Sequence, residues 1–533
     1  MKKTFLLSCL MLAAMPVMAA YTGHVYVDKN KNGVFDQSEK PLAGIKVSDG
    51  LNVVETAADG SFTLPGHERE RFIFITTPSG YKTFNRHYHK IEKKQSGYDF
   101  GLIPYSGRIR KDGSHRYIHI TDTEIFNTEN HADWVNNVHD YARNEQAAFI
   151  IHTGDICYEK GLKAHIKLMN TENMDCPVFY CIGNHDLVKG KYGEELFESI
   201  YGPVYYSFDA GNVHYVVTPM PGGDHAPGYT SDDVCRWLKN DLTHIRPGTP
   251  VVVFNHDLLT YEDTFIFKSK NAGSINLNEY NLKAWVYGHW HINYMKKQGD
   301  VYSVCTSSLD KGGIDHSTTA FRVMHVDSKG DFTSELRYTY LDKNICIASP
   351  AGVMASGVLP VAVNVYSSVS PVREVLYTCL ADGKPVLKNK RLLQSTDWSW
   401  NGELPLSHKY VGKELTLRVT ARFNNGEIAE AESNFICRTE KAVPLFSADW
   451  DNLSGNAKHS APVSAPLNLP LQLAWTNNVG ANLYMTSPLI HKGKVIVASV
   501  DEDLKGAGHV YALNGKDGTI LWSCPVRNSI KNS

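Results

Sequence analysis

The sequence lacks the features by which several classes of protein are recognised. It has no run of lysine or arginine that would follow a polyanion, and its 54 basic and 56 acidic residues give a formal net charge of −2. A nucleic-acid polymer is therefore not an expected partner. None of the ten cysteines forms a C-x-x-C pair, which argues against a zinc knuckle and a dense disulfide framework. Cys176 and Cys181 either pair or remain buried free thiols.

Long apolar runs are missing after the first twenty residues. Residues 1–20 combine Lys2 and Lys3 with the apolar stretch FLLSCLMLAAMPVM and with small residues near position 19, which is the pattern of a cleaved signal peptide. The apolar stretch is too short to remain in a bilayer as a helix. We therefore expect an exported protein, periplasmic or extracellular in a bacterium, with no transmembrane segment in the mature chain.

The chain does contain enough apolar sequence for several cores. It has 533 residues, of which 42% are hydrophobic, and a prior of about 150 residues per domain predicts three or four domains. Residues 21–107 consist of short alternating runs separated by glycine, aspartate and proline, which predicts a β-sandwich. Residues 108–340 alternate buried strands with helical stretches and predict an α/β layered domain. Residues 341–440 return to alternating runs and predict a second sandwich.

Individual elements are predicted within the α/β part. Apolar runs of four to six residues indicate strands, and longer amphipathic stretches indicate helices. The expected strands are RYIHI, AAFIIH, PVFYCI, HYVVTPM, PVVVFN and KAWVYG, and the expected helices cover residues 131–146, 160–172, 191–201 and 231–244.

The last segment, residues 441–533, changes character again. The stretches SPLIHKGKVIVAS and GHVYALNGKDGTILWS resemble blades of propellers built from quinoprotein-type repeats, and little more than one blade is present. One blade cannot close a ring or bury its two faces. We therefore expect either that the sequence is cut short at Ser533 or that this segment docks on its neighbour.

The stretch DKNKNGVFDQSE in the first β domain fits the calcium-loop pattern at every position. Oxygen ligands at alternate positions wrap a hard cation, and Gly33 permits the sharp turn. The flanks are strand-like rather than helical, so the domain resembles the calcium-binding B-type repeats of bacterial surface adhesins. We favour calcium over a polar hairpin loop without metal. The candidate ligands are Asp28, Asn30, Asn32, the carbonyl of Val34, Asp36 and Glu39.

Five segments of the α/β part place metal-ligand side chains directly after a strand. Each residue alone has an ordinary explanation as a helix cap, a packed histidine or a turn. Five in one order do not, and the carboxyl ends of strands in an open α/β sheet meet at one crevice. The residues are Asp122 in ITDTE, Asp155 in HTGDICY, Asn184 and His185 in GNHD, His256 in VVVFNH, and His289 and His291 in GHWH.

These motifs resemble those of the calcineurin-like metallophosphoesterase superfamily, which run D-x-H, G-D, G-N-H-[DE], H and G-H-x-H; the last four are intact here. The resemblance implies a four-layer αββα sandwich, here flanked by β domains and a partial propeller-like segment. It also implies two divalent or trivalent transition-metal ions, which are iron, zinc or manganese. By analogy Asp155 bridges the two ions, Asp122 and His291 hold the first, and Asn184, His256 and His289 hold the second.

Such a centre hydrolyses phosphate esters. Two cations about 3.5–4 Å apart generate hydroxide near neutral pH, and they offset the charge of the phosphoryl oxygens. His185 would protonate the leaving alkoxide or brace the transition state. Asp186 either orients that imidazole or caps the next helix. The loop MPGGDHAPGYT, with Asp224 and His225, either lines the substrate mouth or has no role.

The first motif departs from the family pattern, because Glu124 stands where D-x-H has its histidine. Tyr158, three residues after Asp155, gives G-D-x-x-Y. That motif resembles the purple acid phosphatases, in which a phenolate at this place ligates iron and the first motif has no histidine. Phenolate is a hard ligand that suits a trivalent ion. We therefore favour Tyr158 over Glu124 as the replacement ligand.

The sequence thus predicts an exported metal-dependent phosphoesterase. Its substrate would be a phosphomonoester or phosphodiester, either a small molecule or linked to a glycan. The alternative is a non-catalytic exported binding or surface-display protein with a degenerate metal site. The complete set of second-ion ligands favours the enzyme, whereas the combined length of the flanking β segments favours the alternative.

Overall fold

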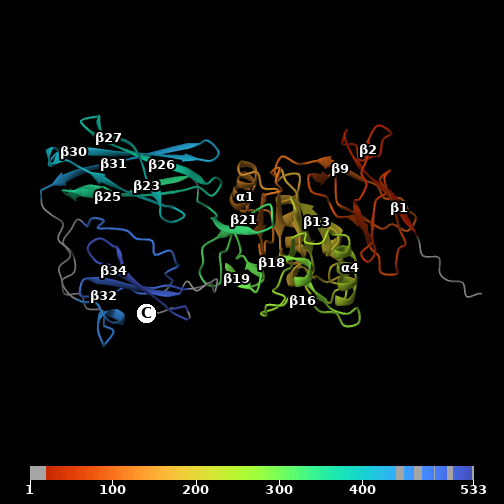
Figure 1. The fold of residues 1–533 in the computed structure, drawn as a ribbon. Helices are drawn as coiled ribbons and strands as arrows, with labels where there is room; N and C mark the ends of the chain where they lie inside the picture. Colours follow the sequence, from red (N-terminus) through yellow and green to blue (C-terminus); the bar gives the residue numbers. More distant parts are fainter. Residues whose placement is uncertain are drawn as a thin grey trace, which may run out of the picture.

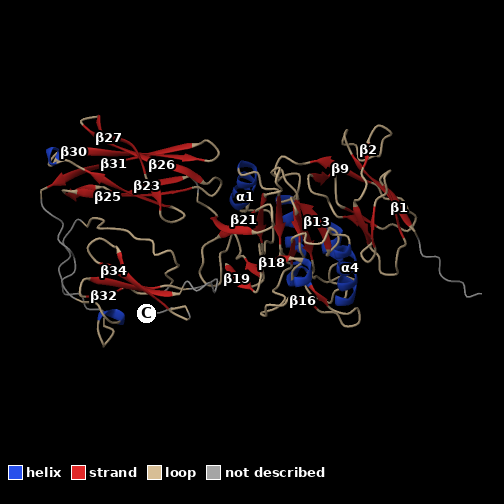
Figure 2. Cartoon of the chain, viewed as in Figure 1, coloured by secondary structure: helices blue, strands red, loops and turns tan. Residues whose placement is uncertain are grey.

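The computed structural model describes residues 20–341, 343–439, 449–460, 471–484, 486–500, 508–527 and 529–530. The expected signal peptide therefore lies almost entirely outside the described residues. Figure 1 shows β structure at both ends of the chain and a mixed part between them, and Figure 2 shows that the longer helices all belong to that middle part. No described helix is long and apolar enough to cross a membrane.

Two small sheets form the N-terminal β structure and share a core that includes Val25, Val47, Phe62 and Ile73. Alternate side chains of each strand point to opposite faces, so short runs with one apolar side suffice to build this core. One sheet contains β2 (Lys40–Pro41), β1 (Tyr21–Val27), β9 (Phe100–Pro104), β7 (Tyr81–Thr83) and β5 (Ser61–Leu64), and the other contains β4 (Val53–Glu55), β3 (Lys46–Ser48), β6 (Phe72–Ile75) and β8 (Tyr88–Lys90).

The loop between β1 and β2 carries the residues of the expected calcium site. The carboxylates of Asp28 and Glu39 each accept hydrogen bonds from two backbone amides of the loop. The side-chain amides of Asn30 and Asn32 both donate to Asp36. The loop is thus closed on itself by its own polar groups, and calcium binding here stays a prediction.

Two larger sheets pack face to face in the middle part. Tyr117 of one sheet meets Tyr215 of the other edge-on, with ring centroids 5.6 Å apart, and Phe149 meets Phe254 in the same way. The first sheet has the order β12 (Val178–Tyr180), β11 (Phe149–His152), β10 (His115–Ile120), β21 (Ala320–Val326), β22 (Phe332–Tyr338); the second has β13 (Tyr206–Ala210), β14 (Val213–Val217), β15 (Val251–Phe254), β18 (Leu282–Tyr287), β20 (Val301–Cys305), β19 (Tyr294–Gln298).

Parallel strands dominate the centre of both sheets. β10, β11 and β12 run parallel to one another, as do β14, β15, β18 and β20. The carboxyl ends of parallel strands open on the same edge of a sheet, which is where ligands bind in such folds. The six strands expected here from the sequence coincide with β10, β11, β12, β14, β15 and β18, and a short pair, β16 (Ile266–Phe267) and β17 (Ile275–Asn276), follows β15.

The helices of this part are α1 (Ala132–Asn144), α2 (Tyr158–Leu168), α3 (Glu195–Tyr201) and α4 (Ser231–Thr243), with the 3-10 turns η1 (Asn184–Asp186) and η2 (Leu277–Tyr280). α1 buries Trp134 and Val138 with residues of β10 and β11. α1 and α4 lie within two residues of their expected bounds, whereas α3 begins four residues later than expected. Gly190 and Gly193 precede it, and glycine in a helix costs about 1 kcal/mol relative to alanine.

The C-terminal β structure contains a sandwich and a separate small sheet. The sandwich shares a core that includes Val361, Val363 and Leu417. Its sheets are β23 (Asn344–Ser349), β25 (Val358–Tyr366), β29 (Ser399–Pro405), β28 (Leu393–Gln394) and β24 (Gly352–Ala355), β31 (Ile428–Arg438), β30 (Glu414–Phe423), β26 (Val372–Ala381), β27 (Lys384–Arg391). The 3-10 turn η3 (His408–Tyr410) lies between β29 and β30, and η4 (Leu453–Gly455) follows the sandwich in the chain.

The small sheet is antiparallel and has four strands, β32 (Leu489–His491), β33 (Lys494–Ala498), β34 (His509–Asn514) and β35 (Ile520–Pro525). Four antiparallel strands are what one propeller blade requires. Membership of a propeller nevertheless stays a prediction, because residues 440–448 and 461–470 lie outside the described part. The nine cysteines of the described residues, including Cys176 and Cys181, are free thiols.

A buried ion pair joins the N-terminal β structure to the middle part. Nη2 of Arg71 lies 2.8 Å from Oε1 of Glu194 and 3.0 Å from Oε1 of Glu198, and the guanidinium lies over the ring of Tyr192 at 4.6 Å. Glu194 is 0% exposed, and its carboxylate also accepts the amide hydrogen of Gly228. A buried carboxylate needs such a partner, because its desolvation is costly.

Replacing Arg71 tests how strongly this pair joins the two parts. Arg71→Met keeps most of the side-chain volume but leaves the buried carboxylate of Glu194 without its cation. The free energy of unfolding should fall by about 3–5 kcal/mol, as measured by urea unfolding. The matched control is Arg418→Met, whose pair with Glu432 is half exposed; it should cost about 1 kcal/mol or less. Equal losses in the two variants would contradict the assignment.

Candidate metal centre

The candidate metal ligands lie on loops that follow the parallel strands of both sheets. The carboxyl ends of these strands thus bring the candidate ligands to one edge of the sheets, although the ligands extend from residue 122 to residue 291 of the sequence. Asp122 follows β10, Asp155 follows β11, Asn184 opens η1 after β12, His256 follows β15, and His289 and His291 follow β18.

The backbone is strained at most of these positions. Positive φ is uncommon outside glycine, and residues held in that region cluster at functional sites. A Cβ atom on Gly183 would lie 2.3 Å from Oδ1 of Asp155, so the GNHD motif needs its glycine to let this carboxylate approach. Six of the eight candidate metal ligands have positive φ: Asp122 (51°), Glu124 (44°), Asp155 (54°), Tyr158 (54°), His289 (66°) and His291 (50°).

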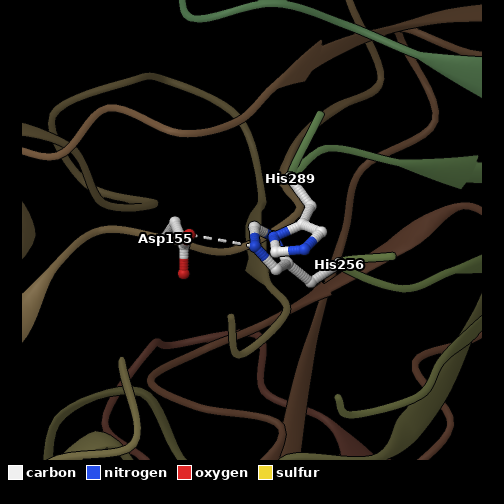
Figure 3. Close-up of side chains that lie close together, drawn as sticks. All are labelled: Asp155, His256 and His289. Atoms are coloured by element: carbon white, nitrogen blue, oxygen red, sulfur yellow. Dashed lines mark ion pairs between the residues drawn. The ribbon is translucent and has the colours of Figure 1, made fainter. Parts of the chain in front are cut away.

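Asp155, His256 and His289 form a compact group, in which each offers a ligand atom within 4.8 Å of the others (Figure 3). Nε2 of His256 lies 3.1 Å from Oδ2 of Asp155 and 3.9 Å from Oδ1 of Asp122. Its Nδ1 lies 2.7 Å from the carbonyl oxygen of Thr153. That carbonyl only accepts, so the proton belongs on Nδ1 and the Nε2 lone pair is left for a metal.

Asp122 and His291 lie beside this group. Nε2 of His291 is 3.5 Å from Oδ1 of Asp122, whose side chain is fully buried. The Asp122 carboxylate also accepts hydrogen bonds from the hydroxyl of Thr121 and the amide of His289. These donors hold the carboxylate in place, as the hydrogen bonds around metal ligands usually do.

Asn184 supplies the observation that tests whether the group fits a metal. Its Oδ1 atom is buried and has no hydrogen-bond partner among the described residues. Leaving a buried acceptor unpaired costs about 1–3 kcal/mol, and a cation would remove that cost. Carboxylate, amide oxygen and imidazole together suit manganese, iron or zinc. The donor set therefore fits transition-metal ions.

Burial and mutual repulsion shift the titration of these groups. Burial raises the pKa of Asp122 to about 6, and burial followed by the Asp155 carboxylate raises the pKa of Asp186 to about 7. Burial alone would lower the pKa of His256, but the carboxylates of Asp155 and Asp122 outweigh it and raise this pKa to about 9. Bound cations would offset the crowding of negative charge at this edge.

Glu124, and not Tyr158, lies beside the first-ion ligands. Oε1 of Glu124 is 3.6 Å from Nε2 of His291, and Oε2 is 2.8 Å from Nζ of Lys311. Lys311 lies in the stretch SSLDKGG after β20 and was not predicted as a functional residue. A single lysine in such a loop carries no motif, so only its contact with Glu124 marks it.

Tyr158 points elsewhere. It is 43% exposed, its ring stacks on Phe126 with centroids 6.3 Å apart, and its hydroxyl lies 3.4 Å from Nδ1 of His185. The positive φ of Cys157 and Tyr158 at the start of α2 turns this ring toward His185. The geometry thus favours Glu124 for the place of the missing histidine, the reverse of the preference drawn from the sequence.

The imidazole of His185 is held by Asp224. Its Nδ1 lies 2.8 Å from Oδ2 of Asp224, and its backbone amide donates to Oδ1 of Asp155. One of the two roles expected for Asp186 was to orient this imidazole. Its carboxylate instead accepts hydrogen bonds from the backbone amides of Cys157 and Gly183. Burial alone would lower the pKa of His185, but Asp224 and Asp155 outweigh it and raise this pKa. His225 is exposed on the same loop as Asp224.

Comparisons with known proteins point to the same chemistry. Residues 115–293 match the family model described as calcineurin-like phosphoesterase, and residues 29–104 match the model described as the N terminal of calcineurin-like phosphoesterase. The chain carries a calcineurin-like phosphoesterase domain. Calcineurin-like phosphoesterases use dinuclear metal centres, which agrees with the candidate ligands. Residues 29–104 of the first β structure are thus similar to a segment found with these phosphoesterases, and the likeness to adhesin repeats stays a prediction.

One individual relative is similar to part of this chain at low sequence identity. Purple acid phosphatase 13 of Arabidopsis thaliana is 26% identical over 215 residues, which is 38% of this chain and 36% of that protein. The match thus spans about a third of the relative's length.

Two solved structures are similar at lower levels. GAP50, the anchor in the inner membrane complex of Plasmodium, is 13% identical with a TM-score of 0.26, over 43% of this chain and 90% of that one. Vacuolar protein sorting 29 from Cryptosporidium parvum is 11% identical with a TM-score of 0.23, over 55% and 99%. TM-scores this low carry no argument. The similarity to calcineurin-like phosphoesterases therefore rests on the two family models.

Metal content checks the ligand set. His256→Ala removes the Nε2 atom that faces both Asp155 and Asp122, so the variant should retain about one transition-metal ion per chain where the wild type holds about two. The measurement is elemental mass spectrometry on protein supplied with iron, zinc and manganese. The control is His139→Ala, a partly exposed histidine on α1, which should keep the wild-type content. Two ions retained in His256→Ala would remove this residue from the site.

A second pair of variants separates Glu124 from Tyr158. Glu124→Gln should weaken binding of the first ion by about 10- to 100-fold, because the charge beside His291 is lost. Tyr158→Phe should leave the metal content as it is, because the hydroxyl faces His185. Competition with a graded series of chelators measures both. Loss of iron in Tyr158→Phe, with Glu124→Gln unaffected, would restore the tyrosine as the replacement ligand.

Proposed function

We propose that this chain is an exported metal-dependent phosphoesterase that hydrolyses a phosphomonoester or phosphodiester. One observation carries the proposal: Asp155 directs one carboxylate oxygen to His256 and the other to the amide of His185. This geometry supports a shared carboxylate at Asp155 with a proton donor, His185, next to it. The match of residues 115–293 to calcineurin-like phosphoesterases supports the same function.

The chain's own residues would bind the ions and move a proton. Asp122, Glu124 and His291 would hold one ion, with Asp155 shared, and Asn184, His256 and His289 would hold the other. Bound there, the two ions would supply an activated water and offset phosphoryl charge. The identity of the metals, iron, zinc or manganese, is left open by this donor set.

His185 is the proton donor in this proposal. Its Nδ1 is engaged by Asp224, so Nε2 is the nitrogen available to the leaving oxygen. The raised pKa of the imidazole favours the protonated form near neutral pH, which general-acid catalysis requires. The side chain is one third exposed, so it is open to substrate on one side. Asp224 would act as its positioning residue.

The finer architecture belongs to the same proposal. Residues 108–340 would form a four-layer αββα catalytic domain, between an N-terminal β domain at 21–107 and β segments after 340. The face-to-face packing of the two large sheets and the burial of α1 against one of them support this layering. Export through residues 1–20 rests on the sequence pattern alone.

One observation favours a second candidate function, that of a non-catalytic binding protein with a degenerate first site. The ammonium of Lys311 lies 2.8 Å from Glu124, so a fixed positive charge stands next to the place of the first ion. A cation–cation repulsion there would weaken metal binding. A protein that holds only the second ion would then display its β domains without catalysing hydrolysis.

Turnover of nitrophenyl esters of phosphate decides between the two. With the metal-loaded full chain and an alkyl phosphate, whose alkoxide must be protonated as it leaves, His185→Asn should lower kcat by about 100- to 10,000-fold while the metal content is retained. With the nitrophenyl esters the loss should be smaller, because nitrophenolate leaves as a stable anion. Asp224→Asn should lower kcat less, by about 10-fold, since the imidazole remains. His139→Asn on α1 serves as the control. A wild type that holds both ions and hydrolyses neither the monoester nor the diester would favour the binding protein.

A further inference from the structure

A cavity of about 560 Å³ opens directly beside the candidate metal centre. His289 is one of its walls and also a candidate ligand of the second ion. Whatever is attached to a phosphate held by the metals therefore has this cavity within reach. Its other lining residues are Asp257, Leu258, Tyr261, Trp290, Ile292 and Ile314.

Trp290 and Tyr261 form an aromatic platform in this cavity. Their ring centroids are 5.9 Å apart and the rings are inclined by 24°. Trp290 is fixed, because its Nε1 donates to Oδ1 of Asp257 at 3.1 Å and its ring meets Tyr287 edge-on at 5.1 Å. Tyr261 is 73% exposed. The platform thus combines a held indole with an exposed phenol ring.

Ile314 adds an apolar side chain beside the metal ligands. It is 74% exposed, yet its backbone amide donates to the carbonyl oxygen of His291 at 2.9 Å. The isoleucine is therefore held next to a candidate ligand. Exposed apolar side chains that gather in one place mark ligand or partner sites more often than scattered ones do.

The polar groups of the cavity restrict what it would accept. Among its described lining residues there is no lysine or arginine, and Asp257, the one carboxylate, already accepts hydrogen bonds from Trp290 and from the amide of Leu258. An anionic extension would find no lysine or arginine here and would face the Asp257 carboxylate. A sugar would find few groups for its hydroxyls, and unpaired buried polar groups are costly.

We propose that Tyr261, Trp290 and Ile314 form a leaving-group subsite, and that the substrate is a phosphate ester of an alcohol that carries an aromatic ring and no anionic group. The proposal rests on the proposed phosphoesterase function and names its substrate class. An aromatic ring would stack on the Tyr261–Trp290 platform in the offset geometry that such rings prefer, while Ile314 covers its edge.

Binding of phosphonates tests the subsite without turnover. Calorimetry on the metal-loaded full chain would compare benzylphosphonate with ethylphosphonate, which share the charged group. The wild type should bind the benzyl compound about 5- to 10-fold more tightly, and Tyr261→Ala should remove most of that preference. Ile314→Ser, a milder change at an exposed position, should reduce it in part. Trp398→Ala, an equally bulky loss in the C-terminal sandwich, should leave the preference intact.

Hydrolysis of benzyl phosphate and ethyl phosphate then separates the two proposals. Both have alkoxide leaving groups, so a lower KM for the benzyl ester reports the subsite rather than the chemistry. If both esters are hydrolysed but the wild type and Tyr261→Ala show the same preference, the subsite is overturned and the phosphoesterase stands. If the wild type binds neither phosphonate and hydrolyses neither ester, the phosphoesterase proposal fails and the subsite fails with it.

Discussion

The carboxylate of Asp155 is the constraint on which the site depends. It sits at the end of β11 between Nε2 of His256 and the backbone amide of His185. Gly183 makes room for it, because a Cβ at this position would lie 2.3 Å from its Oδ1 atom. A negative charge buried in this way demands positive partners. The histidines supply them in part, and cations would supply the remainder.

The N-terminal β structure takes part in the same arrangement. Arg71 reaches Glu194, and Glu194 accepts the amide of Gly228, which lies in the loop that also carries Asp224. Asp224 in turn holds His185. The loop beside His185 is therefore anchored from the first β structure.

The crevice has a charged side and an apolar side. On one side Glu124 and Lys311 pair next to His291, and on another Tyr261, Trp290 and Ile314 line a cavity that has no lysine or arginine among its described lining residues. A phosphate group is bound through opposite charge, whereas an apolar group attached to it is bound through contact with apolar side chains. The crevice offers the two environments next to each other.

Sequence alone was enough for the α/β core and for the order of the ligands. The apolar runs at β10, β11, β12, β14, β15 and β18 are almost entirely buried strands, and their length and composition can be recognised in the sequence. The motifs after them, such as GNHD and GHWH, need particular residue types at short spacing. Such motifs consist of consecutive residues, so they can be recognised without a structure.

Tertiary structure decided the contacts made across the crevice. The choice between Glu124 and Tyr158 depends on how the positive φ at the start of α2 turns the tyrosine ring toward His185. The partner of His185 is Asp224, 39 residues away, rather than its neighbour Asp186. Lys311 and Tyr261 carry no motif at all. Side-chain direction and long-range proximity follow from packing, which no spacing in the sequence encodes.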